Sequence, residues 1–403
     1  MVKTLNAEIV VAGTGPTGMI AALGLAHAGF FVALAGPRPR GDDRRTTALM
    51  RPALTYLDSL GILQRVAGEA APLSVMRIVD ATSRLIRSPI VTFRASEIGE
   101  ESFGLNTPNT VLNEALETAI AEQKTIEWRQ ATVAHWEIGD KSAVATLDDR
   151  TRIEAPLAIA ADGRDSRARE AAGIKTAGRS YRQSALVLNF AHTREHGSTS
   201  TEFHTETGPF TQVPLPGNRS SLVWVVRPET AAELALLDDA ALSMRIEEKM
   251  QSMLGRVTVE PGRQIYPLSS LLPTCFAKNR VALVGEAAHV FPPIGAQGLN
   301  LGIRDVEDIV RTASDDRLDP GSVTALAAYD GRRRPDILAR STAVNLLNLS
   351  LLSDLLPAQM ARSAGLGALK ALSPVRAFFM REGMQPGSGF ARIVSSLREQ
   401  MWR

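Results

Sequence analysis

The sequence predicts an α/β fold: a Rossmann-like nucleotide-binding domain assembled from discontinuous segments, an inserted and mostly antiparallel β-sheet domain, and a C-terminal helical region. Three observations predict this class. A glycine-rich turn lies between an apolar strand and a helix near the N-terminus, strand-like runs broken by Gly, Pro and Asn fill residues 184–226, and helical patterns dominate after residue 284. The length of 403 residues suits two or three domains of roughly 150 residues each.

Residues 8–35 have the pattern of a βαβ unit. Residues 8–12 (EIVVA) and 31–35 (FVALA) are short apolar runs of the kind that form buried parallel strands. The apolar segment 19–29 between them has the length of a helix. A strand, a glycine turn, a helix and a second strand within about 30 residues is the order of a βαβ unit.

The rest of the chain changes pattern several times, and the expected domains follow from those changes. Further elements are expected at residues 74–95 (strands), 106–124 (helix), 143–160 (strands), 231–254 (one amphipathic helix) and 280–284 (a buried strand). The expected domain boundaries are 1–73, 100–180 and 275–340 for the nucleotide-binding domain, 74–99 and 181–274 for the β-sheet domain, and 341–403 for the helical region.

Composition and charge exclude several classes of protein. The chain is 44% hydrophobic and 22% charged, which is typical of a packed protein. A formal net charge of +2 gives no support for nucleic acid as a partner. The single cysteine, Cys275, excludes an internal disulfide and a cysteine-based metal or iron–sulfur site. Because the chain shows neither an export signal nor a run of 18 apolar residues, we expect a cytoplasmic protein.

Gly13, Gly15 and Gly18 match the pattern G-x-G-x-x-G with a strand before it and a helix after it. The first glycine permits the tight turn, the second lets a pyrophosphate approach the backbone, and the third lets helix and strand pack closely. The amide groups and the dipole of the helix then face the anion. The turn therefore predicts a dinucleotide site, and the pattern alone does not separate NAD from FAD.

The acid that would bind the ribose is absent from the end of the second strand, because Ala35 stands there. We expect backbone groups and water to hold the ribose. The alternative is that Asp42 or Asp43 folds back to it.

Two later segments strengthen the prediction of a nucleotide site. Residues 162–169 read DGRDSRAR and follow the apolar run 157–161. Residues 285–289 read GEAAH after a buried strand, and residues 292–305 read PPIGAQGLNLGIRD. Either segment alone could be a turn or a capped helix. Together with the first turn, their order makes coincidence improbable.

In these three motifs the sequence resembles the single-component FAD-dependent aromatic hydroxylases, the group that includes para-hydroxybenzoate hydroxylase. Within that group it is most similar to the ubiquinone-biosynthesis hydroxylases, which act on polyprenylated rings. The stretch 43–49 (DRRTTAL), the flavin-ring loop 297–305 (QGLNLGIRD) and the ending 379–384 (FMREGM) carry that similarity. The resemblance spans essentially the whole chain.

The resemblance implies FAD as the cofactor, with NADPH or NADH docking transiently. It implies that the glycines line the pyrophosphate, that Arg45 contacts the ribityl or phosphate region, and that Asp162 faces the path of the nicotinamide nucleotide. Glu286 stands where the family has Asp and would bond the ribityl chain. The full implied set is Gly13, Gly15, Pro16, Thr17, Gly18, Arg45, Asn109 (or Asn106), Asp162, Gly163, Gly285, Glu286, Gly298, Leu299 and Asn300.

The resemblance also implies the reaction, in which reduced FAD and O2 form a 4a-hydroperoxide that attacks an electron-rich ring. The implied activity is hydroxylation of a polyprenylated phenol or benzoquinol in ubiquinone biosynthesis. Two alternatives stay open: a flavin hydroxylase of a soluble aromatic metabolite, and a non-catalytic scaffold subunit of a quinone-synthesis complex.

No catalytic base stands out in the sequence. His289 and Pro293 are the candidates because they flank the flavin loop, and the alternative for His289 is a packed histidine that bonds a nearby carbonyl. No metal site is expected, since His192 and His196 lie in a strand-like or loop stretch. The cluster 332–334 (RRR) predicts a solvated helix face.

The C-terminal segment 341–403 combines a leucine-rich stretch with a basic excess. It contains seven Lys/Arg and three Asp/Glu, a formal charge of +4. We expect a helix that packs on the FAD domain, or one that docks on a membrane surface or a quinone-biosynthesis complex. This segment makes a peripheral position at the inner membrane an expectation.

Overall fold

The computed structural model describes residues 4–83, 87–292, 297–352 and 356–384. Its central sheet is parallel apart from the edge strand β20, and its strands follow the order β20-β21-β13-β2-β3-β9. The bounds of these strands are β20 Ala277–Lys278, β21 Val281–Leu283, β13 Leu157–Ala160, β2 Ile9–Ala12, β3 Val32–Ala35 and β9 Ile126–Arg129. The predicted βαβ unit is confirmed, and the late strand lies beside β13.

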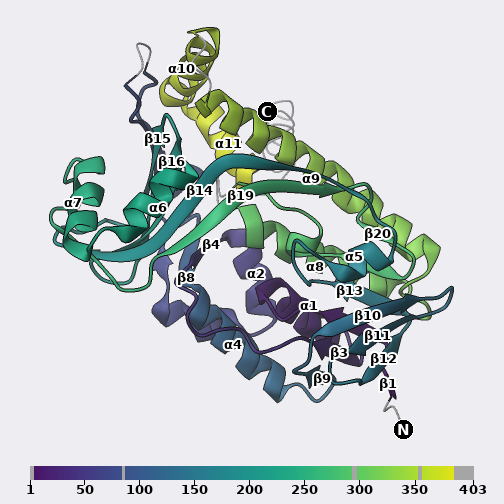
Figure 1. Cartoon of the computed structure of the whole chain (residues 1–403). Coiled ribbons are helices and arrows are strands. Elements are labelled where there is room, and N and C mark those ends of the chain that lie inside the picture. Colours follow the sequence, from purple (N-terminus) through teal and green to yellow (C-terminus); the bar gives the residue numbers. More distant parts are fainter. Residues whose placement is uncertain (1–3, 84–86, 293–296, 353–355, 385–403) are drawn as a thin grey trace.

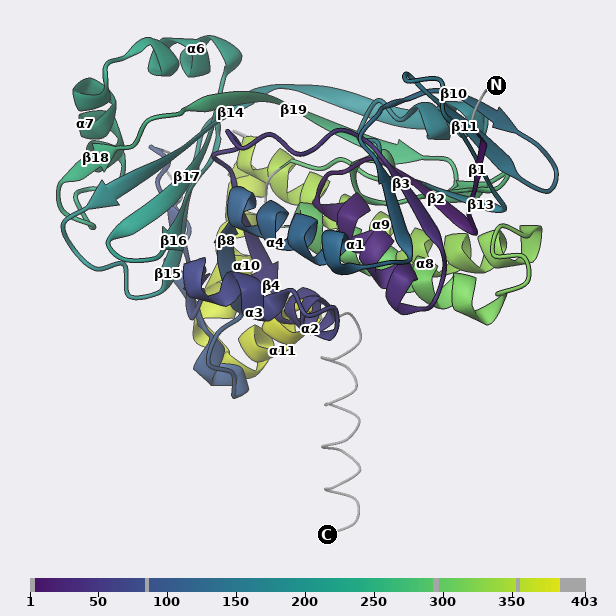
Figure 2. The ribbon, with the colours of Figure 1, turned by 90° about the horizontal axis from the view of Figure 1, so that it is seen from below.

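Helices cover one face of this sheet and a second sheet covers the other (Figures 1 and 2). Helix α1 (Pro16–His27) packs between α4 (Asn109–Glu122) and α8 (Gln297–Asp315). On the opposite face lie β1 (Thr4–Asn6), β12 (Arg152–Ala155), β11 (Ala143–Leu147) and β10 (Val133–Ile138), in that order. One continuous apolar core fills these layers, with β2, β3 and β13 buried along their whole length.

The β-sheet domain is built around a separate, mostly antiparallel sheet with the strand order β18-β14-β17-β16-β15-β6-β7. Its strands are β6 Val75–Asp80, β7 Val91–Arg94, β14 Thr176–His192, β15 Thr199–Thr205, β16 Gly208–Leu215, β17 Arg219–Val226 and β18 Val257–Val259. Helices α6 (Pro228–Leu236) and α7 (Asp239–Lys249) pack on its outer face over a separate apolar core.

A long two-stranded ribbon joins the two halves of the molecule. Strand β14 pairs with β19 (Gln264–Pro273) from Thr176 opposite Pro273 to Val187 opposite Gln264, and the ribbon arches over the structure in Figure 1. A small sheet of β4 (Thr46–Met50), β8 (Gly104–Pro108) and β5 (Ala71–Pro72) lies between the halves. The exact domain boundaries stay a prediction.

The single helix expected at residues 231–254 is wrong, because the structure has α6 and α7 there. Leu237 is extended, and the Asp238 carboxylate accepts a hydrogen bond from the Ala241 amide at 2.7 Å. This is an N-cap that begins a new helix. The helix expected from residue 106 begins at Asn109, since residues 104–108 form β8.

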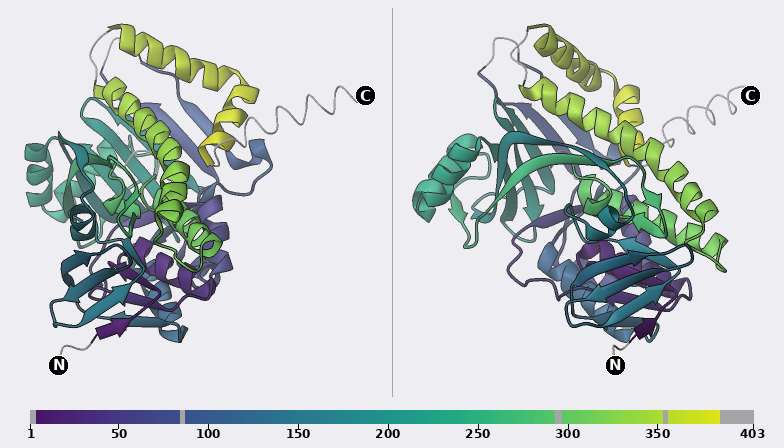
Figure 3. Two further views of the ribbon diagram at one scale, coloured as in Figure 1. Left: turned by 90° about the vertical axis from the view of Figure 1, so that its right-hand side faces the viewer. Right: turned by 45° about the vertical axis from the view of Figure 1, so that its right-hand side comes forward.

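The C-terminal region is helical as expected, with α9 (Val323–Leu352), α10 (Leu356–Ala371) and α11 (Ser373–Met384). Helix α9 packs on α8, α10 lies against β7, and α11 lies against the short helix η2 (Ala95–Ile98). Figure 3 shows α10 and α11, in yellow-green and yellow, at the end of the molecule opposite the N-terminus. Within the described residues, no helix combines the length and the apolar composition needed to cross a bilayer. Pro293 and Ile294 lie outside the described residues.

Candidate active site

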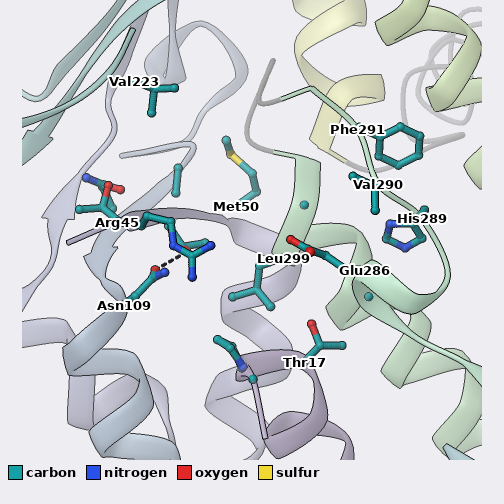
Figure 4. Close-up of a pocket in the computed structure, with 18 of the residues that line it drawn as sticks. Thr17, Arg45, Met50, Asn109, Val223, Glu286, His289, Val290, Phe291 and Leu299 are labelled. Atoms are coloured by element: carbon teal, nitrogen blue, oxygen red, sulfur yellow. Dashed lines mark hydrogen bonds between the residues drawn. The ribbon is translucent and has the colours of Figure 1, made fainter. Parts of the chain in front are cut away.

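A cavity of about 840 Å³ opens where the parallel sheet, the small sheet and the β-sheet domain meet. Its lining divides into a polar half, made by the three sequence motifs with Arg45 and Asn109, and a mostly apolar half, made by the β-sheet domain with Met50, Leu73 and Val290. The cavity brings together the predicted residues Gly13, Gly15, Pro16, Thr17, Gly18, Arg45, Asn109, Asp162, Gly163, Gly285, Glu286, Gly298, Leu299 and His289. Figure 4 shows Arg45 and Asn109 on one side of it and Glu286 and His289 on the other.

Each glycine of the first turn has the steric environment that the motif predicts. A Cβ on Gly13, where φ is +110°, would lie 2.1 Å from the Ala161 carbonyl oxygen, and one on Gly18 would lie 2.0 Å from the Gly13 oxygen. A Cβ added to Gly15 would meet no atom within 4 Å, and Gly15 is the N-cap of α1, without a side-chain cap. The start of α1 therefore offers free amides to an anion.

The Asp162 loop is held by its own motif residues. Ser166 caps α5 (Arg167–Ala171) by accepting from the Arg169 amide. The buried Arg169 guanidinium donates to the Ala287 carbonyl at 2.9 Å and to the Arg164 carbonyl at 2.7 Å. Arg169 thereby joins the two later motifs. Asp162 Oδ2 accepts from the Ala168 amide, whereas Oδ1 is buried with no partner among the described residues.

The loop that starts at Gly285 is anchored by a fully buried carboxylate. Asp305 on α8 accepts from the Gly285 amide at 2.9 Å, from His289 Nε2 at 2.7 Å and from Arg333 Nε at 2.8 Å. Burial raises the pKa of Asp305, but His289 and Arg333 outweigh it and hold that pKa below its ordinary value. His289 also stacks on Phe291, with ring centroids 5.5 Å apart.

The cluster 332–334 is not uniformly solvated, and for Arg333 the expected solvated face is wrong. Its side chain is 3% exposed and pairs with Asp305, Asp308 and Asp336, whereas the Arg334 side chain is 43% exposed. Consecutive helical residues point about 100° apart, so only one of the three arginines faces the core.

A polar network positions Arg45 at the cavity. Asp43 accepts two hydrogen bonds from the Arg45 guanidinium, at 2.8 and 2.7 Å, and a third from Asn109 Nδ2 at 3.0 Å. Burial raises the pKa of Asp43, but these bonds lower it below its ordinary value. Thr47 donates to Asn109 Oδ1. The Asp43 carboxylate is thus engaged by Arg45 and Asn109.

Of the three predicted residues in the first turn of α8, two line the cavity and one does not. Gly298 and Leu299 line the cavity, while Asn300 does not. The Asn300 side chain instead joins α8 to β4, accepting from the Met50 amide at 2.8 Å and donating to the Ala48 carbonyl at 2.7 Å. The predicted contacts of all these residues with FAD stay predictions.

The polar half fits FAD in its chemistry. The open N-terminus of α1 suits a pyrophosphate, Arg45 supplies a cation, and the orphaned Asp162 Oδ1 can accept from a hydroxyl of the ribityl chain. Glu286 reaches across to Arg164, with 3.5 Å between Oε2 and Nη2, and is half exposed to the cavity. The site therefore has room for the methylene by which Glu286 is longer than the family's Asp.

The other half of the cavity is mostly apolar, and its lining also includes one acidic residue, Glu202, and one basic residue, Arg77. Its apolar lining consists of Met50, Leu73, Met76, Ile78, Phe93, Val213, Val223 and Val290. Glu202, on β15, lines the same space together with Ser200 and Thr211. The sequence reasoning missed Glu202, Asp305 and Arg169; the spacing of Glu202 and His204, two apart on a strand, is the one local signal for the first.

The comparisons with known proteins agree with this geometry. The family model described as "FAD binding domain" matches residues 6–339. The chain is 32% identical over 390 residues to ubiquinone hydroxylase UbiL of Rhodospirillum rubrum, covering 94% of this chain and 89% of that protein. It is 29% identical to 3-demethoxyubiquinol 3-hydroxylase of Escherichia coli, covering 90% and 94%.

A solved structure shares the fold. The p-nitrophenol 4-monooxygenase PnpA of Pseudomonas putida superposes with a TM-score of 0.75 at 20% identity, covering 95% of this chain and 97% of that one. The expected family and cofactor are confirmed. The chain belongs to the FAD binding domain family and is an FAD-dependent monooxygenase of the aromatic hydroxylase type.

Proposed function

We propose that this enzyme hydroxylates a polyprenylated phenol or benzoquinol of ubiquinone biosynthesis, with NAD(P)H as reductant and O2 as oxidant. The observation that carries the proposal is the continuity of the cavity. One space of about 840 Å³ joins the polar half of the cavity (the FAD cradle) to the mostly apolar half, which is formed largely by the β-sheet domain. An aromatic ring with an apolar tail matches such a lining, and the relatives are named as hydroxylases of ubiquinone and 3-demethoxyubiquinol.

When bound, FAD supplies the activation of O2. The chain's own residues must bind the cofactor, exclude water and orient the ring. Met50 and Val290 stand at the junction of the two halves, and Phe93 and Val223 line the apolar half. These side chains shield the reacting region from water and leave space for a planar ring.

We also propose that α9–α11 rest on a membrane surface from which a prenylated substrate is drawn. Exposed apolar side chains stand on these helices at Leu338 (47%), Met360 (59%) and Phe379 (55%), and at Leu372 (51%) between α10 and α11. Lys370 is exposed among them, and the charge of +4 on residues 341–403 favours an anionic surface. The alternative is that this region binds a quinone-biosynthesis complex. In a liposome flotation test, protein that floats with anionic vesicles supports the membrane surface, and protein that stays unbound supports the alternative.

The test of the reaction uses FAD-loaded protein with 2-geranylphenol as a prenylated probe and 4-hydroxybenzoate as a soluble one. We expect NAD(P)H consumption to be stimulated by 2-geranylphenol, with a hydroxylated product detected by mass spectrometry. Efficient hydroxylation of 4-hydroxybenzoate with none of 2-geranylphenol would contradict the proposed substrate class. Protein that binds no FAD after reconstitution would contradict the enzyme assignment itself.

A further inference from the structure

Glu202 is the acidic side chain that the β-sheet domain presents to the apolar half of the cavity. Side chains alternate along a strand, so Ser200, Glu202 and His204 of β15 share one face. Directly opposite Glu202 lie Thr211 on β16 and Ile78 on β6, which also line the cavity. The Glu202 carboxylate therefore stands on an otherwise largely apolar wall that faces the FAD cradle.

A buried histidine orients this carboxylate. His204 Nε2 lies 2.8 Å from Glu202 Oε1, and the His204 side chain is only 3% exposed. An ionised carboxylate only accepts hydrogen bonds, so Nε2 carries the hydrogen in this pair. Thr211 Oγ1 donates to Oε2 over a longer 3.5 Å. Each oxygen keeps lone-pair capacity for a donor that enters the cavity.

The site has the chemistry expected of a general base. The Glu202 side chain is 17% exposed, and its open side is the cavity. His289, the candidate from the sequence, is engaged by Asp305. Glu202 thus offers an oriented carboxylate in the mostly apolar half of the cavity, which is the half proposed to take the aromatic ring.

We propose that Glu202 binds the ring hydroxyl of the aromatic substrate and acts as its general base, with His204 as a positioning residue. This inference rests on the proposed function. The hydroxyl O–H bond breaks, its proton passes to a Glu202 oxygen, and its electron pair moves into the ring toward the carbon that receives the new hydroxyl group. That carbon then loses its hydrogen as a proton, which is taken up as the second oxygen atom of O2 leaves as water, and Glu202 returns its own proton to the ring oxygen.

The oxidant and reductant of this step are the O2 and NAD(P)H of the monooxygenase reaction. O2 supplies one oxygen atom to the ring and one to water, and NAD(P)H supplies the electron pair. Glu202 is unchanged after each turnover. Because Glu202 takes its proton from the ring hydroxyl, it raises the electron density only of a ring that carries a hydroxyl group.

The test is Glu202→Gln in the FAD-loaded full chain, with 2-geranylphenol as the probe. Glu229→Gln is the matched control, because Glu229 is exposed on α6 away from the cavity. We expect Glu202→Gln to keep FAD and its rate of flavin reduction within about twofold. Product formation should fall about a hundredfold or more, within the range measured for loss of a general base. The NAD(P)H consumed should then yield hydrogen peroxide in place of product.

Three further variants keep the test decisive. Glu202→Asp retains the charge and draws the carboxylate back by one methylene, so we expect at least a tenfold loss of kcat with FAD retained. His204→Phe should lower kcat more than it raises KM, and His204→Gln, which restores an N–H donor, should recover part of the loss. Product formation by Glu202→Gln or Glu202→Asp at the rate of Glu229→Gln would overturn the inference. Absence of product from the FAD-loaded wild-type protein would instead overturn the proposed function.

Discussion

Arg333→Met tests the buried charge network behind the candidate active site. The Arg333 side chain is 3% exposed and lies 2.8 Å from Asp305, which is fully buried. Removing one partner of a buried ion pair leaves a desolvated charge, and such changes cost about 3–5 kcal/mol of the free energy of unfolding. Asp308 and Asp336 also lose this partner, so we expect the upper end of that range.

Arg334→Met is the matched control, one residue further along the same helix. Its side chain is 43% exposed and pairs with Asp330 at 2.7 Å, a contact of the kind worth about 0–1 kcal/mol. Urea unfolding followed by tryptophan fluorescence measures both variants. Because Asp305 holds the Gly285 amide, Arg333→Met should also release FAD at a lower urea concentration. Equal losses of stability in the two variants would refute the reasoning.

Three further predictions follow from the cradle. Gly15→Glu places a carboxylate in the open space at the start of α1, and we expect it to abolish FAD retention; a normal flavin spectrum would refute the assignment of the turn. Asp162→Ala removes a carboxylate whose Oδ1 is unsatisfied and whose Oδ2 accepts from the Ala168 amide, so it should slow flavin reduction more than it lowers the urea midpoint, which stopped-flow kinetics and unfolding can separate. The depressed pKa of Asp305 stabilises the fold above the unfolded value of about 3.9 and ceases to do so as pH falls through the lower folded value. Urea midpoints between about pH 3 and 6 should therefore decline less steeply in Arg333→Met than in Arg334→Met, and identical slopes would contradict this.

The sequence predicts the βαβ unit and the polar half of the cavity because their determinants are local. The glycine spacing at residues 13–18 and the Asp162 motif each lie within one turn or loop, and their patterns specify backbone geometry directly. The N-cap at Asp238 was also a local signal, but the surrounding helical periodicity concealed it.

The long-range contacts could not be predicted, because their partners are far apart in the chain. Asp305 on α8 meets Arg333 on α9 and His289 in the loop that starts at Gly285. No local pattern specifies which arginine of the cluster faces inward. Alternation places Glu202 and His204 on one face of a strand, but only the packing of the β-sheet domain decides that this face lines the cavity.

The central claim is that this chain inserts oxygen from O2 into a prenylated aromatic ring. The direct test is turnover of 2-geranylphenol by FAD-loaded protein under 18O2, with the product analysed by mass spectrometry. We expect one 18O atom in each product molecule, and none when the label is supplied as H2-18O. Oxygen drawn from water, or NAD(P)H oxidation that yields only hydrogen peroxide, would contradict it.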